Sequence, residues 1–267
     1  MINFFYKENY SFEDLLEIMR ILRSEEGCPW DREQTHGSIR ANLIEEAYEA
    51  AEAIDLGDSA LLCEELGDVL LQVVFHSRMS EEAGGFAIGD VTDGVCKKLI
   101  VRHPHIFGDI KAETSEEVLS NWEDIKNKTK GHKTPSDAVN AVARSLPALI
   151  RAEKVQGRAE KSGLGKSEPK TAEERFEKER ERFAVSLSAG TGAEDALGEL
   201  LFAAAGIARS MGINPERALE KATDRFAGRF AKLEKLAEEK GVSFQGTGSE
   251  ELDMLWDKLE TEERQNA

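Results

Sequence analysis

The chain lacks the features that mark several large classes of protein. No apolar run approaches the roughly 20 residues that cross a membrane, so we expect no membrane partner. The N-terminal residues do not follow the order of a signal peptide. Its three cysteines are odd in number and widely spaced, which favours free thiols, each a small buried apolar side chain, in a cytoplasmic protein.

Several binding and catalytic motifs are missing as well. None of the five histidines lies at zinc-site spacing from a cysteine. A ferritin-like di-iron centre needs a Glu-x-x-His from each of two helices, and only Glu33 and His36 fit. No Walker-type glycine loop and no Gly-x-Ser-x-Gly elbow occurs. A nucleotide would therefore have to be held through a metal ion and side chains.

The composition favours helices and disfavours one class of partner. The formal net charge of −17 argues against nucleic acid as a partner. Clusters of β-branched and aromatic residues are sparse, whereas helix formers are abundant, so we predict an all-α fold. A chain of 267 residues is long enough for one large or two modest domains.

Two acidic clusters on consecutive predicted helices are the strongest candidate for a functional site. Glu46 and Glu49 lie three residues apart, as do Glu65 and Asp68, so each pair points from one helix face. Two such helices packed antiparallel would bring four carboxylates to one point. A solvated acidic face is the alternative, since 52 residues of the chain are acidic.

The second of these helices reads as buried. Most positions from Leu61 to Phe75 are apolar, which is typical of a helix covered on most sides. Converging carboxylates there must take up protons or bind a cation, and a hard divalent cation, Mg²⁺ first and Mn²⁺ second, suits oxygen ligands. Such a site favours hydrolysis of a phosphoanhydride, with Glu45 as a spare carboxylate that positions water or acts as a base.

Capping and breaking residues predict the remaining elements. The expected helices span 12–26, 38–56, 59–83, 89–102, 116–130 and 148 to about 161. Residues 27–36 should form a loop in which Trp30 is a packing anchor or a pocket wall, and residues 131–137 a linker. The cations of the helices at 89–102 and 116–130 are candidate phosphate contacts, and a solvated basic face is equally compatible with them; they are Lys97, Lys98, Arg102, Lys126 and Lys128.

The second half of the chain repeats parts of the first. Residues 66–71 read LGDVLL and residues 197–202 read LGELLF, with their glycines 131 residues apart. Arg229 and Trp256 correspond to Arg102 and Trp122. The counterparts of Glu46, Glu49, Glu65 and Asp68 are Lys178, Glu181, Ala196 and Glu199. Because one carboxylate is lost and one is replaced by a cation, we expect the second copy to be structural or regulatory.

Taken together, five motifs resemble the MazG family of all-α nucleoside triphosphate pyrophosphohydrolases. They are Glu-Glu-x-x-Glu at 45–49, Glu-x-x-Asp at 65–68, Gly-Cys-Pro-Trp-Asp at 27–31, Arg-His-Pro-His-Ile-Phe at 102–107 and Trp-Glu-Asp-Ile-Lys at 122–126. The resemblance covers almost the whole chain. It implies tandem MazG-like helical bundles that form a homodimer. We expect an N-terminal domain at 1–130, a linker and connecting helix at 131–170, and a C-terminal domain at 171–267.

The resemblance also implies an activity, which is Mg²⁺-dependent cleavage of nucleoside triphosphates into monophosphate and pyrophosphate. By motif position the metal ligands are Glu46, Glu49, Glu65 and Asp68, with Glu45 close by. Lys98, Arg102 and Lys126 would contact phosphates, and Trp122 would flank the nucleotide. The family's basic pair is Val101-Arg102 here, so one phosphate contact is missing.

The altered residues of the second copy, which include Glu260 where the first copy has Lys126, place the expected activity in the N-terminal half. Two other readings stay open. One is a non-catalytic helical adaptor or regulator that kept the fold. The other is a house-cleaning pyrophosphatase restricted to non-canonical or deoxy nucleotides.

Overall fold

The computed structural model describes residues 4–109, 114, 117, 118, 122, 125, 134–165, 168–244 and 250–265. Throughout these residues the regular secondary structure is helical and no strand occurs, which confirms the predicted all-α fold. Contacts between residues divide the chain into two compact units, Met1–Lys126 and Asn127–Ala267. The three-part division at 130 and 170 stays a prediction.

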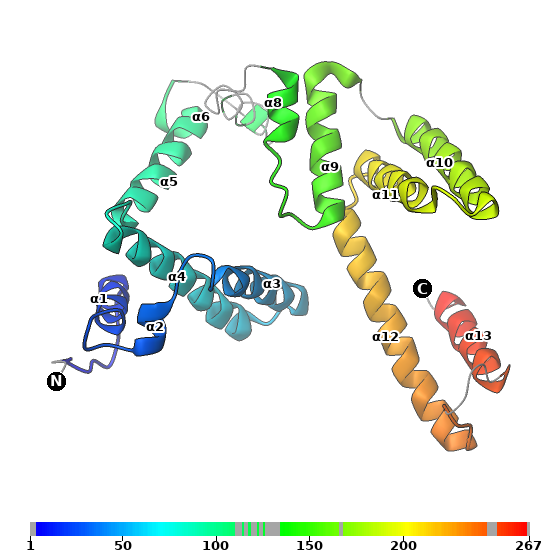
Figure 1. Ribbon diagram of the computed structural model, residues 1–267, viewed down its shortest axis with the longest axis horizontal. Helices are drawn as coiled ribbons and strands as arrows, with labels where there is room; N and C mark the ends of the chain where they lie inside the picture. Colours follow the sequence, from blue (N-terminus) through cyan, green and yellow to red (C-terminus); the bar gives the residue numbers. More distant parts are fainter. Residues whose placement is uncertain are drawn as a thin grey trace. The chain divides into compact units, whose positions relative to one another are not determined.

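The first unit is built from six described helices (Figure 1). They are α1 (Phe12–Leu22), α2 (Pro29–Glu33), α3 (Arg40–Leu56), α4 (Ser59–Glu82), α5 (Ile88–Arg102) and α6 (Pro104–Phe107). The predicted capping box of Ser11 and Asp14 starts α1. Gly57 ends α3 with φ 68°, a conformation that favours glycine, and the Asp58 carboxylate then accepts hydrogen bonds from the first backbone amides of α4. This tight turn folds α4 back along α3.

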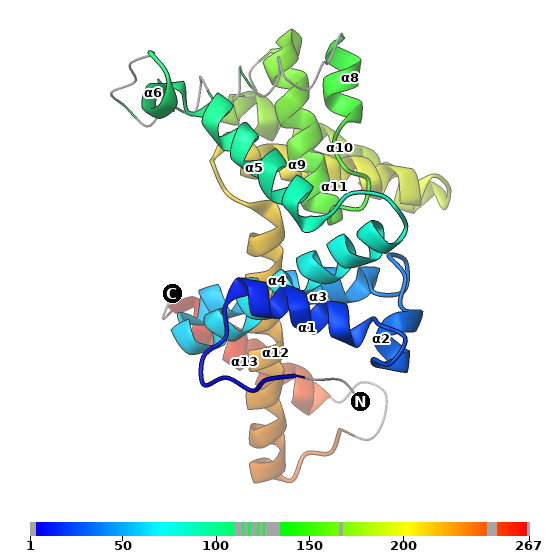
Figure 2. The ribbon, with the colours of Figure 1, turned by 90° about the vertical axis from the view of Figure 1, so that its left-hand side faces the viewer.

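The two halves of the long helix α4 pack against different helices. Its C-terminal part packs with α1 in a core formed by Met19, Ile39, Val74, Phe75 and Met79. Its N-terminal part runs alongside α3, as Figures 1 and 2 show. The contact with α1 therefore fixes the C-terminal end of α4. The N-terminal end, which carries Glu65 and Asp68, packs beside α3.

Burial along α4 differs from the sequence prediction. Leu66 and Leu70 are 53% and 40% exposed, and the buried residues of the helix begin only at Gln72. The prediction of a helix covered on most sides is thus wrong for its first half. The reason is that the core with α1 and Ile88 forms only further along the helix, at Leu71, Val74, Phe75 and Met79.

Several local predictions are also corrected. The first helix ends at Leu22 rather than at residue 26, and the expected loop contains the short helix α2. Trp30 lies on α2 and is 60% exposed, so it is not a packing anchor. Cys63 and Cys96 are exposed rather than buried, although all three cysteines are free thiols as predicted.

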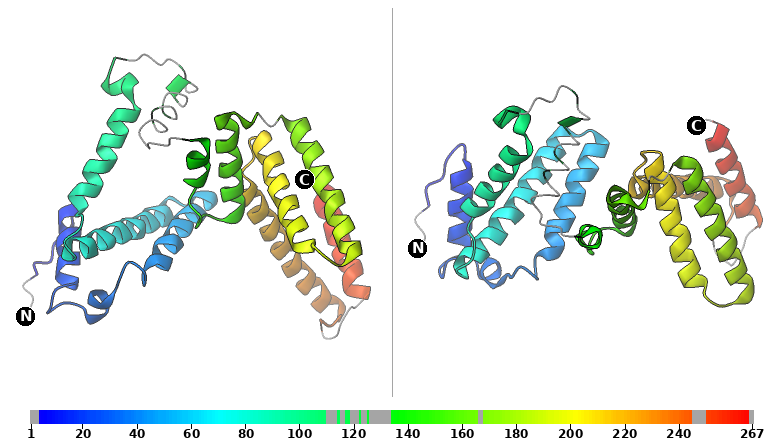
Figure 3. Two further views of the ribbon diagram at one scale, coloured as in Figure 1. Left: turned by 45° about the horizontal axis from the view of Figure 1, so that its top comes forward. Right: turned by 90° about the horizontal axis from the view of Figure 1, so that it is seen from above.

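The second unit contains six α-helices and one π-helical turn within the described residues (Figure 3). They are α8 (Pro135–Asn140), α9 (Ala148–Ala159), η1 (Glu160–Leu164), α10 (Pro169–Ala189), α11 (Ala193–Ser210), α12 (Pro215–Lys240) and α13 (Glu250–Gln265). Helix α8 occupies part of the predicted linker, because Thr134 and Asp137 form a capping box there. The predicted helix at 116–130 lies largely outside the described residues.

Helix pairs organise this unit. Figure 3 shows α10 alongside α11, and α9 packs on α11. Helices α12 and α13 pair through a small core of Leu233, Leu255 and Leu259. Among the described helices, none taken singly has the length and apolar composition of a membrane span, and only α11 and α12 together, bent by 106°, meet that criterion.

Candidate active site

Three of the four predicted ligand residues converge where α3 and α4 lie side by side. One carboxylate oxygen from each of Glu46, Glu49 and Glu65 lies within 4.8 Å of the others. Glu46 and Glu65 are half-buried, and Glu49 is exposed. In the part of the chain that the structure describes, no other three acidic, histidine or cysteine side chains meet this criterion. The antiparallel pairing expected from the sequence thus forms an acidic cluster.

The charge of Asp68 affects the pKa values of two residues in this cluster. Burial raises the pKa of Glu46, and the charges of Asp68 and Glu49 raise it further. Burial also raises the pKa of Glu65, followed by the charges of Glu49 and Asp68. The neighbouring carboxylates therefore oppose the ionisation of Glu46 and Glu65, which is the electrostatic condition that a bound cation relieves.

The structure adds a carboxylate that the sequence argument missed. Glu52, on α3, contributes to the raised pKa of Glu65. It follows Glu49 by three residues, so the same helical spacing that selected Glu46 and Glu49 also points to it. Glu45 is exposed on α3 next to Glu46.

The predicted phosphate contacts are placed only in part. The guanidinium of Arg102 lies over the ring of Trp122, 5.1 Å from its centroid, and makes no ion pair with a described residue. Lys98 is exposed on α5, whereas Lys126 lies outside the described residues. Helix α5 meets the core through Ile88, at the end of α4 distant from Glu65. The described contacts therefore do not bring these cations to the carboxylates.

The second unit repeats the arginine–tryptophan pair with a different charge environment. Arg229 lies over Trp256, 5.0 Å from the ring centroid. Its guanidinium also pairs with Glu260 at 3.4 Å and Glu263 at 3.0 Å. Two carboxylates thus pair with Arg229, whereas Arg102 makes no ion pair with the described residues of the first unit.

The counterparts of the acidic cluster are also altered in space. Lys178 and Glu181 are exposed on α10, and Glu199 is exposed on α11. Ala196, which corresponds in sequence to Glu65, is 2% exposed. The second unit therefore does not rebuild the acidic cluster.

A histidine pair on the first unit was not predicted. The Nδ1 atoms of His36 and His76 lie 2.8 Å apart, and the rings are stacked. Burial, followed by the charge of His36, lowers the pKa of His76. Because the two residues are 40 positions apart, sequence spacing gave no signal for this contact. His36 thus contacts a histidine of α4, and the Glu33–His36 spacing forms no cluster of metal-ligand type.

The fold and the site define an all-α protein with facing carboxylates on an antiparallel helix pair. Residues 34–107, which include α3, α4 and α5, match the model of the MazG nucleotide pyrophosphohydrolase domain. The chain is 42% identical over 247 residues to the nucleoside triphosphate pyrophosphohydrolase/pyrophosphatase MazG of Thermotoga maritima, with 92% of this chain and 94% of the relative covered. It is 41% identical over 256 residues to the nucleoside triphosphate pyrophosphohydrolase of Escherichia coli K12, with 93% and 97% covered.

The crystal structure of a mazG-related protein from Thermotoga maritima is 31% identical in sequence to this chain. The match covers 43% of this chain and 98% of that protein, with a TM-score of 0.37. The sequence identities over almost the full length decide the assignment. The chain belongs to the MazG family of nucleoside triphosphate pyrophosphohydrolases, as its motifs predicted.

Proposed function

We propose that this chain hydrolyses nucleoside triphosphates to nucleoside monophosphate and pyrophosphate, with Mg²⁺, at the acidic cluster of α3 and α4. The observation that carries the proposal is the convergence of Glu46, Glu49 and Glu65 within 4.8 Å. The names of the two relatives, which are similar to this chain over nearly their full length, support the same reaction. The active site then lies in the N-terminal half.

The chemistry of the donor set fits a hard divalent cation. All donors of the cluster are carboxylate oxygens, which suit Mg²⁺ and its substitute Mn²⁺ better than softer metals. The raised pKa values of Glu46 and Glu65 reflect repulsion that such a cation would neutralise. Glu46, Glu49, Glu65 and Asp68 would hold it. When bound, the metal supplies charge neutralisation for a polyphosphate and lowers the pKa of a coordinated water.

The chain's own side chains supply the other functions. Glu45, exposed beside Glu46, would orient the attacking water and accept its proton. Arg102 presents a planar guanidinium suited to two phosphate oxygens, and Lys98 adds a second positive charge. Trp122, which stacks under Arg102, would flank the nucleotide. Lys126 is proposed as a further phosphate contact from its motif position.

We also propose that the protein is a cytoplasmic homodimer. Apolar side chains of the first unit stay exposed on α4 and α5, among them Leu66, Leu70, Val95 and Leu99. Leu66 and Leu70 lie four residues apart on α4, as do Val95 and Leu99 on α5, so each pair forms an exposed apolar helix face, which is typical of an interface. Light scattering should give twice the chain mass, and Leu66→Glu should shift it towards a monomer. A wild-type mass equal to that of one chain at micromolar concentration would contradict the dimer.

Product analysis tests the reaction itself. ATP and dUTP are incubated with the protein and Mg²⁺, with and without excess chelator, and the products are resolved by phosphorus NMR. Monophosphate and pyrophosphate that require the metal support the proposal. Diphosphate and orthophosphate would show a different reaction class. An absence of turnover across a full nucleotide panel would favour the adaptor, and turnover confined to unusual bases or deoxy sugars would favour the house-cleaning enzyme.

A further inference from the structure

The first half of α3 lacks the packing that fixes its second half. Ala50 and Ala53 are the buried residues of α3, and both lie near the turn into α4. No residue from 40 to 49, all of which the structure describes, is buried. Glu46 and Glu49 lie in this stretch, so the position of their carboxylates depends on how the two ends of α3 are held.

Two contacts hold the beginning of α3 on α4. Ile39, the residue before the helix, is 2% exposed in the core shared with α1 and α4. Three residues earlier, the Nδ1 atom of His36 lies 2.8 Å from Nδ1 of His76. At 1.5 Å per residue, His76 is about 12 Å along α4 from Asp68. The histidine contact therefore lies outside the acidic cluster and anchors the end of α3 that is remote from the turn.

Hydrogen-bonding groups on α4 assign the proton between the two rings. His76 Nε2 and Gln72 Oε1 are both buried, and neither has a hydrogen-bond partner among the described residues. Residues four apart are neighbours on a helix, so a proton on His76 Nε2 has an acceptor one turn away, whereas a bare Nε2 would leave two buried acceptors without a donor. With the proton on Nε2, Nδ1 of His76 accepts and Nδ1–H of His36 donates.

Protonation reaches the two rings in a fixed order. His36 is exposed, so it can take up a proton at Nε2 while its Nδ1–H still donates to His76. A proton on His76 would occupy Nδ1, the accepting atom, and would set two cations against each other. Burial and the charge of His36 lower the pKa of His76, so this second proton binds below the ordinary 6.5. The contact therefore survives the first proton and is lost with the second.

Charged groups on the surrounding elements do not offset this effect. Among the described residues, the charge that acts on the pKa of His76 is that of His36. Two nearby arginines pair with the same glutamate of α4 instead. The charged groups on the elements packed around the pair are Arg23 at the end of α1, Glu33 on α2, Arg40 on α3, Arg78 and Glu82 on α4, and Asp90 on α5.

We infer that His36 and His76 are positioning residues for the acidic cluster, and that they hold the first half of α3 against α4 only while His76 is uncharged. Acidification then lets this half of α3 move away, so that Glu46 and Glu49 part from Glu65. Protonation of the carboxylates has the opposite effect, because it removes repulsion between the two helices. The sign of the pH response thus identifies the controlling group. The consequence for metal binding rests on the proposed function, whereas the movement of α3 does not.

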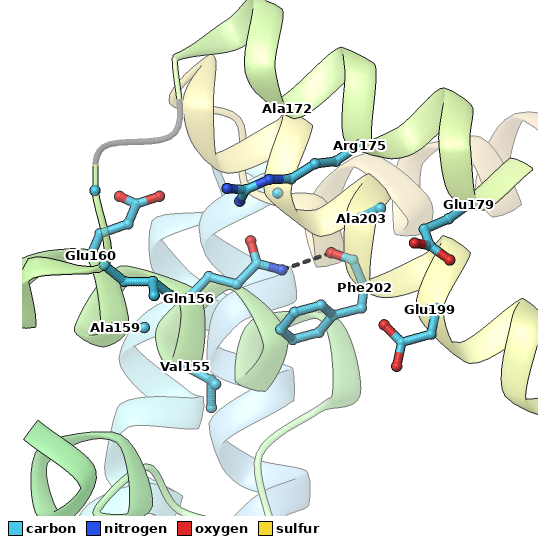
Figure 4. A pocket seen from close by; sticks show the side chains of 13 residues that line it. Val155, Gln156, Ala159, Glu160, Ala172, Arg175, Glu179, Glu199, Phe202 and Ala203 are labelled. Carbon is cyan, nitrogen blue, oxygen red and sulfur yellow. Dashed lines mark hydrogen bonds between the residues drawn. The ribbon is translucent and has the colours of Figure 1, made fainter.

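The second unit supplies an internal control. Its helices α10 and α11 pair as α3 and α4 do, and Ile207 stands 131 residues after His76. Residues 134–267 contain no histidine. Helix α11 is joined to α9 by a neutral bond, in which the Gln156 side-chain amide donates to the backbone carbonyl of Phe202 at 2.7 Å, beside a cavity between α9, α10 and α11 (Figure 4). Exchange in α10 should therefore not follow histidine titration.

Hydrogen exchange of the metal-free full chain tests the movement. Backbone amide exchange is measured with excess chelator between about pH 8 and pH 5, the range in which histidine titrates, and is corrected for intrinsic rates. In the wild type, protection of residues 40–49 should fall below about pH 6.5 by up to about 10-fold per pH unit, the slope for uptake of one proton. His76→Gln should keep its protection, since a neutral amide still accepts from His36. His103→Gln is the matched control, because Nδ1 of His103 donates within α5 to the carbonyl of Leu99 at 2.6 Å.

Titration with Mg²⁺ tests the effect on the acidic cluster. His76→Lys places a permanent charge beside His36 and should weaken Mg²⁺ binding at neutral pH by roughly 10-fold, the lower end of the range for groups that orient metal ligands. Circular dichroism shows whether this variant is folded. His76→Gln provides the second measurement, since it should bind Mg²⁺ as the wild type does at neutral pH and more tightly than the wild type below pH 6.5.

Each other outcome has a defined meaning. Equal protection of residues 40–49 in wild type and His76→Gln at every pH would overturn the inference. Protection that rises on acidification of the wild type would overturn it too, since the carboxylates would then control the helix pair. A folded His76→Lys variant with wild-type Mg²⁺ affinity would refute the effect on the acidic cluster. If the wild type binds no Mg²⁺ at any pH, the proposed function fails, and the exchange measurement alone decides whether the histidines hold α3.

Discussion

The acidic cluster makes a counter-intuitive prediction about stability in the absence of metal. Because burial and the charges of Glu49 and Asp68 raise the cost of ionising Glu46 and Glu65, replacing Glu65 by the isosteric Gln should raise the melting temperature of metal-free protein. The same substitution removes a metal ligand, so Mg²⁺ should stabilise the variant much less than the wild type. One side chain thus destabilises the metal-free protein and stabilises the metal-bound one.

Binding linkage sets the size of the metal effect. Mg²⁺ at 100 times its Kd should add about 2.7 kcal/mol to the unfolding free energy of the first unit. For a unit of the length of Met1–Lys126, this corresponds to a rise of roughly 10 °C in Tm. Glu181→Gln is the matched control, since Glu181 is the exposed counterpart of Glu49 in the second unit. The Glu181→Gln variant should show the same rise in Tm with Mg²⁺ as the wild type.

The pH dependence has a definite sign. The pKa values of Glu46 and Glu65 are raised above their ordinary 4.5 in the folded protein, so the folded state holds protons that the unfolded state has released. Without metal, their contribution to stability is therefore largest below about pH 4.5 and is lost as the pH rises through the raised values. Calorimetric melts of wild type and Glu65→Gln with chelator measure this difference. A variant that melts lower than wild type without metal, or shifts equally with Mg²⁺, would refute the reasoning.

Three further predictions concern other parts of the structure. Met19→Ala should cost about 2–5 kcal/mol in a denaturant titration because Met19 is 1% exposed, whereas Met254→Ala, at a 72% exposed site, should change stability by less than about 0.5 kcal/mol. In kinetic assays, Arg102→Ala should lower kcat/KM by roughly 10-fold or more because a charged phosphate contact is lost. Arg229→Ala should leave turnover intact, but it should lower the free energy of unfolding by about 1–3 kcal/mol because Glu263 loses its partner. Because the pKa of His76 is lowered in the folded protein, the unfolded state takes up a proton first as the pH drops. The free energy of unfolding should therefore fall below about pH 6.5. In urea titrations at several pH values, His76→Gln should make this fall smaller.

Local patterns predicted the elements that matter for the acidic cluster. The spacing of Glu46 and Glu49 on one helix and of Glu65 and Asp68 on the next, joined by a tight turn, was enough to place carboxylates together. Such spacing acts through helix geometry, which depends on neighbouring residues alone. The helical fold followed from composition for the same reason.

Contacts between distant segments were beyond the reach of that reasoning. The His36–His76 contact, the burial of α4 only from Gln72 onward and the exposed position of Trp30 all depend on how helices pack. The cavity beside Phe202 likewise arises from the approach of α9 to α11, which no spacing within either helix encodes. Periodicity reports which face of a helix is apolar, but it does not report what covers that face.

Turnover of a matched pair of variants tests the central claim most directly. Asp68→Asn removes a proposed ligand in the first unit, and Glu181→Gln removes an exposed carboxylate at a corresponding ligand position of the second. With ATP and Mg²⁺, pyrophosphate release should fall by orders of magnitude in the first variant and match wild type in the second. Wild-type rates in Asp68→Asn, or their loss in Glu181→Gln alone, would contradict an active site on α3 and α4.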